Sequence, residues 1–220
     1  MSRYEPIREK QIDWTLFVAS PYAAFLQTVI DPISGTVDQQ KLNELSYALV
    51  RDSLRSDTFS FPRKVLVGIL GEINEKIKQK SSDDASQNCL DVRVAKQVLL
   101  GLMAIDPRAL FSFCYVSNLD HAATEILCHC SEAHQLEIFK QSGMKGFLIR
   151  HGLELAKRKE IGRQMKLLVC REIRDCLPRV NNPGEREGLS KTLEQIIDII
   201  ATSEEDRDFL RRLYKPRDWA

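Results

Sequence analysis

A cluster of histidine and cysteine residues between positions 114 and 134 is the strongest chemical signal in this sequence. It holds three of the four histidines and three of the six cysteines: Cys114, His121, Cys128, His129, Cys130 and His134. The fourth histidine, His151, follows shortly after. Thiolates and imidazoles are the ligands that zinc prefers, and a structural zinc site uses four ligands in tetrahedral geometry. The window is therefore the first place to look for a metal centre.

The spacing within this window argues against a metal site. Structural zinc sites use regular pairs such as C-x2-C, and Cys128-His129-Cys130 is tighter than that. Residues two apart on a helix point roughly 200° apart, so Cys128 and Cys130 face one ion only if the helix breaks before Ser131 and brings the pair together. Cys130 and His134, the weak candidate ligands, share a face only if one helix runs through Ser131. The plainer interpretation makes Cys130 a small buried hydrophobic residue, and we predict no metal and no cofactor.

Cys170 is a second candidate for chemistry, as a nucleophile. It is flanked on its predicted helix by Arg163, Lys166 and Arg174, and nearby cations favour the reactive thiolate. No nucleophile motif surrounds it, and the sequence contains no phosphate-binding loop, G-x-S-x-G elbow or H-E-x-x-H motif. The alternative is a half-buried structural cysteine. We therefore expect a protein that is not an enzyme.

The segment 150–179 is locally basic, with nine Lys and Arg residues against four Asp and Glu residues. Its predicted helix over 159–176 directs an apolar stripe inward and charged residues outward. Such a face suits an acidic protein or phosphate groups, whereas a solvated face with mixed charges is the plainer alternative. Aromatic residues for stacking bases are scarce here, so we favour a protein partner. The predicted partner-binding residues are Arg163, Lys166, Arg171, Arg174 and, near the end of the sequence, Trp219.

The overall composition is that of an ordinary globular protein. The 220 residues are 43% hydrophobic and 29% charged, with a formal net charge of +1. No global field therefore points to nucleic acid or to a membrane surface. The sequence shows no signal peptide and no run of 18 apolar residues, so we expect no membrane span. Irregularly spaced cysteines favour reduced thiols, in the cytoplasm or the nucleus.

Apolar residues recur at helical spacing along the whole chain, and the predicted helices carry the candidate residues named above. We predict about eleven or twelve antiparallel helices and therefore an all-α fold. Expected helix starts are Ser20–Pro21, a capping box at Thr36–Gln39, Asp106–Pro107, Asp120, Ser131 and Ser203. Leu42, Leu45, Leu49 and Leu54 form one expected buried face, and Gly68 and Gly71 indicate a closely packed neighbouring helix. We expect a single domain over 1–220, with the polar stretch 78–88 as a candidate loop or sub-domain boundary.

The run EIFKQSGMKGFLIRHGLELAKRKEIGRQMKLLVCREIRDCL, residues 137–177, resembles a unit of an armadillo or HEAT helical repeat. A short helix ends at a glycine, a medium helix follows, and a long helix closes the unit. The resemblance covers about a fifth of the chain. It implies a solenoid-like array of helices, and an irregular helical bundle is the alternative architecture.

These observations favour a non-catalytic interaction or adaptor module, which binds a partner protein through a helical groove or a basic helix face. The expected partner is acidic or peptide-like. One alternative is a helical protein that binds nucleic acid through the 150–179 face, with a steep dependence on salt. Another is a self-assembling structural protein resembling a viral matrix component, so homo-oligomerisation is kept open as well.

Overall fold

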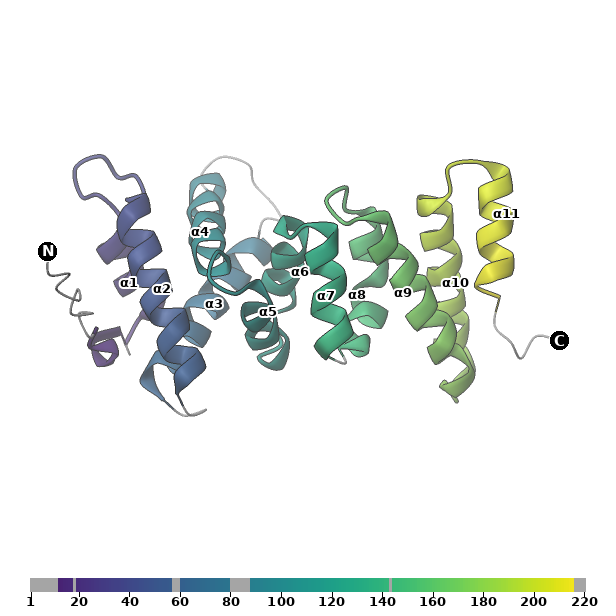
Figure 1. Cartoon of the computed structure of the whole chain (residues 1–220), viewed down its shortest axis with the longest axis horizontal. Helices are drawn as coiled ribbons and strands as arrows, with labels where there is room; N and C mark the ends of the chain where they lie inside the picture. Colours follow the sequence, from purple (N-terminus) through teal and green to yellow (C-terminus); the bar gives the residue numbers. More distant parts are fainter. Residues whose placement is uncertain (1–11, 18, 57–59, 80–87, 143, 216–220) are drawn as a thin grey trace, which may run out of the picture. The chain divides into compact units, whose positions relative to one another are not determined.

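The structure is a computed structural model that describes residues 12–17, 19–56, 60–79, 88–142 and 144–215. Over these residues it contains eleven α-helices, two short 3-10 helices and no strand, which confirms the all-α prediction (Figure 1). The elements are η1 (Trp14–Phe17), α1 (Pro21–Val29), α2 (Gln39–Arg55), α3 (Phe61–Gln79), α4 (Asn88–Met103), α5 (Pro107–Val116), α6 (Asp120–His129), α7 (Glu132–Ser142), α8 (Lys145–Lys157), α9 (Arg163–Cys176), η2 (Leu177–Arg179), α10 (Pro183–Ile200) and α11 (Glu204–Leu213).

The chain divides into two compact units, Met1–Ala122 and Ala123–Ala220, which are described separately. The division falls inside α6. The stretch 78–88, our candidate boundary, lies mostly outside the described residues. A single domain over 1–220 stays a prediction.

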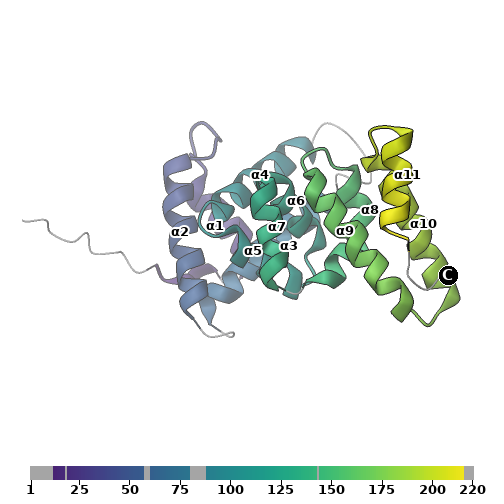
Figure 2. The same cartoon turned by 45° about the vertical axis from the view of Figure 1, so that its right-hand side comes forward.

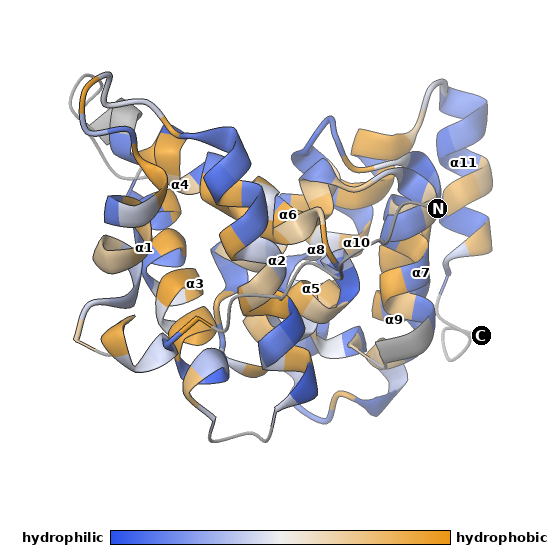
Figure 3. Cartoon of the chain, turned by 60° about the vertical axis from the view of Figure 1, so that its left-hand side comes forward, coloured by the Kyte–Doolittle hydropathy of each residue, from blue (hydrophilic) through white to orange (hydrophobic). Residues whose placement is uncertain are grey.

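Helix α3 is the central element of the first unit, where it contacts α1, α2, α4 and α5. Its buried stripe follows the i, i+3, i+4, i+7 spacing through Leu66, Ile69, Leu70 and Ile73. Alternating hydrophobic and hydrophilic bands along the helices are visible in Figure 3. A close neighbour explains Gly68, because an added Cβ would lie 2.7 Å from Cγ of Pro21. At Gly71 an added Cβ meets nothing within 4 Å, so the expected close packing is confirmed at Gly68 only.

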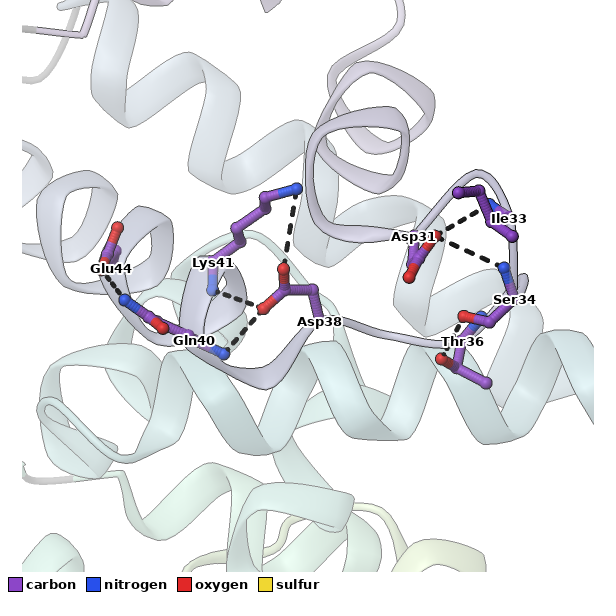
Figure 4. A network of polar contacts seen from close by, with 8 residues as sticks. All are labelled: Asp31, Ile33, Ser34, Thr36, Asp38, Gln40, Lys41 and Glu44. Carbon is purple, nitrogen blue, oxygen red and sulfur yellow. Dashed lines mark hydrogen bonds and ion pairs between the residues drawn. The ribbon is translucent and has the colours of Figure 1, made fainter.

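Two aspartates organise the loop between α1 and α2 (Figure 4). The Asp31 carboxylate accepts hydrogen bonds from two backbone N–H groups at the loop tip, at 2.8 and 3.4 Å. Asp38 is the N-cap of α2 and accepts from the N–H groups of Gln40 and Lys41, both at 3.1 Å. The capping box expected at Thr36 is therefore misplaced by two residues, since the carboxylate of Asp38 reaches the free N–H groups of the first turn.

Helix α5 shows how short-range signals set an element's ends. Asp106 caps its start, as expected, and accepts from two first-turn N–H groups at 3.1 and 3.0 Å. At the other end Asn118 adopts a positive φ of 56°, and the N–H of Leu119 donates to the carbonyl of Cys114 at 2.8 Å. This is a Schellman ending, in which asparagine takes the left-handed position usually given to glycine.

The start of α6 is capped from another helix. Asp120 was expected to be its cap, but Asp120 is the first residue of the helix itself. The buried side chain of Asn74, on α3, instead accepts from the N–H groups of His121 and Ala122 at 3.0 and 3.1 Å. An amide 47 residues away thus supplies the acceptor that a local cap normally provides.

In the second unit, α8, α9 and α10 contact one another pairwise and lie side by side in Figures 1 and 2. Gly152 of α8 permits this approach, because an added Cβ would lie 2.6 Å from Cγ1 of Val169 and 3.5 Å from Cδ1 of Ile196. Helices α7, α8 and α9 follow the short–medium–long order noted over 137–177, with 11, 13 and 14 residues. Membership of an armadillo or HEAT family stays a prediction.

A buried glutamine fixes the loop that leads into α9. The side-chain NH2 of Gln135 donates to the carbonyls of Leu127, Cys130 and Glu160 at 3.0, 3.1 and 3.0 Å. Its carbonyl accepts from the N–H of Gly162 at 3.1 Å. The residues before 163 are thereby held in a loop, so α9 begins four residues later than the expected position 159.

Candidate protein-binding groove

A groove in the first unit lies between the end of α2, the first half of α3, and α5. Its volume is 640 Å³, within the size range typical of ligand-binding pockets. The lining residues are Leu54, Arg63, Lys64, Val67, Gly68, Ala109, Ser112, Phe113, Val116 and Ser117.

The groove exposes apolar side chains from three different helices. Leu54 of α2 is 47% exposed and Val116 of α5 is 78% exposed. Val67 of α3 lies half-buried between them in the lining. Single exposed hydrophobic residues are normal on protein surfaces, but a group that lines one concavity is typical of an interaction site.

Two cations border this apolar surface. The guanidinium of Arg63 lies over the ring of Phe113, 4.7 Å from its centroid. The ammonium of Lys64 lies 5.7 Å from the centroid of Phe61, whose side chain is 47% exposed. Within the described part of the chain, neither cation forms an ion pair with a carboxylate. Over the residues that the structure describes, the contacts of both cations are to aromatic rings.

The lining combines apolar side chains with two cations and two hydroxyl groups. Its polar side chains are Arg63, Lys64, Ser112 and Ser117, and the set includes no carboxylate, histidine or cysteine. The groove therefore provides apolar contacts next to two positive charges.

The basic face predicted on α9 lies in the second unit, and two of its residues bind within that unit. Arg163 contacts both carboxylate oxygens of Asp206, at 3.0 and 2.9 Å. Arg174 pairs with Asp175 at 2.7 Å and donates to the carbonyl of Leu213 at 3.3 Å. Both guanidinium groups thus tie α9 to itself or to the α11 region, although Arg163 remains half-exposed.

Lys166, Arg171 and Trp219 are the other residues of the predicted partner-binding site. Lys166 is half-buried, and burial holds the pKa of its ammonium below the ordinary value. Arg171 is exposed and lies 3.4 Å from the buried carboxylate of Glu172, which Lys145 also contacts at 3.1 Å. Trp219 lies outside the described residues.

Cys170 faces the interior and not the neighbouring cations. It is fully buried, and burial raises the pKa of its thiol to about 12. Cys114 is equally buried, and its pKa is likewise raised to about 12. The expectation that nearby arginines favour a Cys170 thiolate is therefore wrong, since desolvation disfavours the charged form.

The helix over the histidine and cysteine window breaks at Ser131. Helix α6 ends at His129, and α7 begins at Glu132. The condition under which Cys130 and His134 share one helix face is therefore not met. Cys130 is half-buried, while the exposed His134 lies 3.1 Å from the hydroxyl of Ser131. Over the described residues, no group of three or more His, Cys, Asp or Glu side chains is arranged to hold a metal ion.

The groove was missed at the level of sequence, although a signal for it exists. Leu54 was placed on the buried face of α2, yet it follows Leu49 by five residues and is turned about 140° away. Val116 is likewise turned about 200° from the buried Cys114. Apolar residues off the buried stripe were the sign of an exposed apolar surface.

Comparison with known proteins gives no match to this chain among protein-family models, curated proteins or solved structures. Over the residues that the structure describes, no single helix has the length and apolar character needed to cross a membrane, and one sharply bent pair, Asp91–Met103 with Pro107–Val116, meets the criterion jointly.

Proposed function

We propose that this chain is a non-catalytic protein-interaction module whose α2–α3–α5 groove binds an acidic, amphipathic helix of a partner protein. The observation that carries the proposal is the pair of cations, Arg63 and Lys64, beside exposed apolar residues from three helices. A groove of this kind suits the apolar face of a helix, with anchors at i, i+4 and i+7. Carboxylates flanking those anchors would meet the two cations.

The groove supports this function better than the basic face of α9 does. Three of the four α9 cations, Arg163, Arg171 and Arg174, already have carboxylate partners, at 2.9, 3.4 and 2.7 Å. A new partner would have to replace those contacts. Over the described residues, Lys64 and Arg63 contact aromatic rings instead, so a partner would not have to replace a carboxylate contact there.

The proposal is tested with the full chain and two synthetic peptides. One peptide carries leucine at i, i+4 and i+7 flanked by glutamate, and the other carries lysine in place of glutamate. Fluorescence anisotropy should detect binding of the acidic peptide only, with an affinity that falls as salt rises. Val116→Asp should weaken binding at least about tenfold, equivalent to about 1.4 kcal/mol.

Ile33→Asp is the matched control, because Ile33 is 96% exposed in the first unit but does not line the groove. It should leave peptide binding unchanged. Equal loss in both variants, or no binding of the acidic peptide, refutes the assignment. If a single-stranded oligonucleotide binds instead, and Lys64→Glu weakens it while Val116→Asp does not, the nucleic-acid alternative replaces it.

A further inference from the structure

Helix α11 in the second unit is anchored along one face only. Leu210 and Tyr214 are buried on that face. Charged residues beside them pair within the unit, with Arg207 3.1 Å from Asp198 and Arg211 3.0 Å from Glu194. The buried residues and ion pairs on this inward face hold α11 within the second unit.

The opposite face of α11 combines exposed apolar residues with charges of both signs. Phe209 is 55% exposed and Leu213 is 48% exposed, and the two are four residues apart on one side of the helix. Glu205 and Arg212 are exposed beside them. Arg212 donates to a backbone carbonyl of its own helix at 3.2 Å, but neither charged group forms an ion pair within the described residues.

We propose that this outward face of α11 is a homotypic contact, which binds the same face of a second copy of the chain in antiparallel orientation. Glu205 and Arg212 each lie 3.5 residues from the midpoint between positions 208 and 209, about 5 Å along the axis. A two-fold axis at that midpoint places Glu205 of each copy opposite Arg212 of the other. It also brings the two Phe209 rings together at the centre.

The charge order selects a second copy as the occupant. The first turn of α11 is acidic and the last turn is basic, so the helix is complementary to itself when reversed. A parallel arrangement would instead face Glu205 with Glu205. A two-fold interface uses the same patch on both copies, which this pattern satisfies. One helix pair buries less than the standard ~1,200–2,000 Å² interface, so the association is weak and depends on concentration.

The inference is independent of the proposed groove, because it rests on a different helix and a different unit. Sedimentation equilibrium of the full chain over a wide concentration range should show reversible self-association. Phe209→Ser should weaken it at least about tenfold, as expected for a central aromatic anchor. Val116→Asp, which disrupts the groove, should leave it unchanged. Loss of association in Val116→Asp would place the self-contact in the groove and overturn the inference.

Charge exchange gives the sharpest test of the antiparallel geometry. Glu205→Arg alone and Arg212→Glu alone should each weaken association, whereas an equal mixture of the two variants should restore it, because both cross pairs become attractive. Glu185→Arg, the same change in the first turn of α10, controls for the helix dipole and should have no effect. Melting curves confirm that each variant folds.

Failure of the mixture to restore association overturns the antiparallel pairing. A wild-type chain that stays monomeric at high concentration overturns the inference as a whole. So does a Phe209→Ser variant that melts earlier without any change in mass, because the ring would then pack within its own chain.

Discussion

Replacing Gln135 should strongly destabilise the second unit. The side chain is fully buried and joins the end of α6 to the loop before α9 through four contacts of 3.0–3.1 Å. Gln135→Leu keeps the volume but removes every one of these hydrogen bonds. The carbonyls of Cys130 and Glu160 and the N–H of Gly162 then lose their side-chain partner.

The size of the expected loss in stability follows from the carbonyls of Cys130 and Glu160 and the N–H of Gly162. The three hydrogen bonds are partly buried, and one such bond contributes about 0.5–1.5 kcal/mol to stability. The carbonyl of Leu127 adds little, since the N–H of Cys130 also donates to it at 3.1 Å. Taking about 1 kcal/mol for each of the three bonds gives a loss of about 3 kcal/mol in the free energy of unfolding. For a chain of this size that corresponds to a fall of about 6–12 °C in Tm.

Gln135→Glu separates hydrogen bonding from packing. A glutamate still accepts from Gly162, but above its pKa it directs a buried negative charge at three carbonyl oxygens. Burial raises the pKa of such a group in the folded state above its unfolded value of about 4.3. The variant is therefore closest to wild type below that pH, and its deficit grows as pH rises through the folded-state pKa.

Urea denaturation of the full chain, followed by circular dichroism from pH 3 to 8, measures both variants. Gln164→Leu is the matched control, because Gln164 is exposed and its side chain makes none of these contacts. It should change stability by less than about 0.5 kcal/mol. A loss below about 1 kcal/mol in Gln135→Leu, or the same pH dependence in both Gln135 variants, would refute the reasoning.

Three further predictions concern packing, acid stability and thiol reactivity. Gly152→Ala should destabilise by about 1–3 kcal/mol through overpacking against Val169, whereas Gly71→Ala, with open space around it, should stabilise by up to about 1 kcal/mol in urea melts. A backbone N–H in the α10–α11 loop lowers the pKa of Asp206 below 3.8, so its contribution to stability is complete above that pH and is lost as pH falls through the lower value. Asp206→Asn should therefore flatten the acid limb of the stability profile, and an unchanged limb would contradict this. Cys170 should resist iodoacetamide at pH 8 until the chain unfolds, as judged by mass spectrometry, and rapid labelling of the native protein would refute its burial.

Local signals in the sequence predicted the N-caps of α5 and α11, although the cap of α2 lies two residues after the expected Thr36 and Ser20 makes no side-chain cap hydrogen bond at α1. Asp106 and Ser203 were expected as N-caps, and both side chains accept from first-turn N–H groups. Asn74 was not foreseen as the cap of α6, because its acceptor reaches the helix from 47 residues away. Capping requires only an acceptor near free N–H groups, and sequence spacing identifies that acceptor only when the chain itself brings it close.

The same limit explains the interpretation of the basic α9 helix. The sequence predicted that Arg163 lies on a charged, outward face, and its neighbours in the chain gave no reason to expect an ion-pair partner. Its carboxylate partner, Asp206, lies 43 residues further on, at the start of α11. The sequence shows that a side chain is charged. Whether that charge is free to bind a partner depends on which distant segment packs beside it.

When an apolar residue lies off the buried stripe of its helix, that helix alone does not show whether the residue is simply exposed or forms part of a larger apolar surface. Leu54 and Val116 each lie on the wrong face for their own helix, and each, taken alone, would be an ordinary exposed hydrophobic residue. They line one groove only because α2 and α5 flank α3 and direct them toward the same space as Val67. Helical periodicity identifies the apolar residues that lie off the buried stripe. Tertiary packing determines whether such residues from different helices lie next to one another. Their coincidence beside two cations without carboxylate partners in the described chain is the reason to assign binding to the groove.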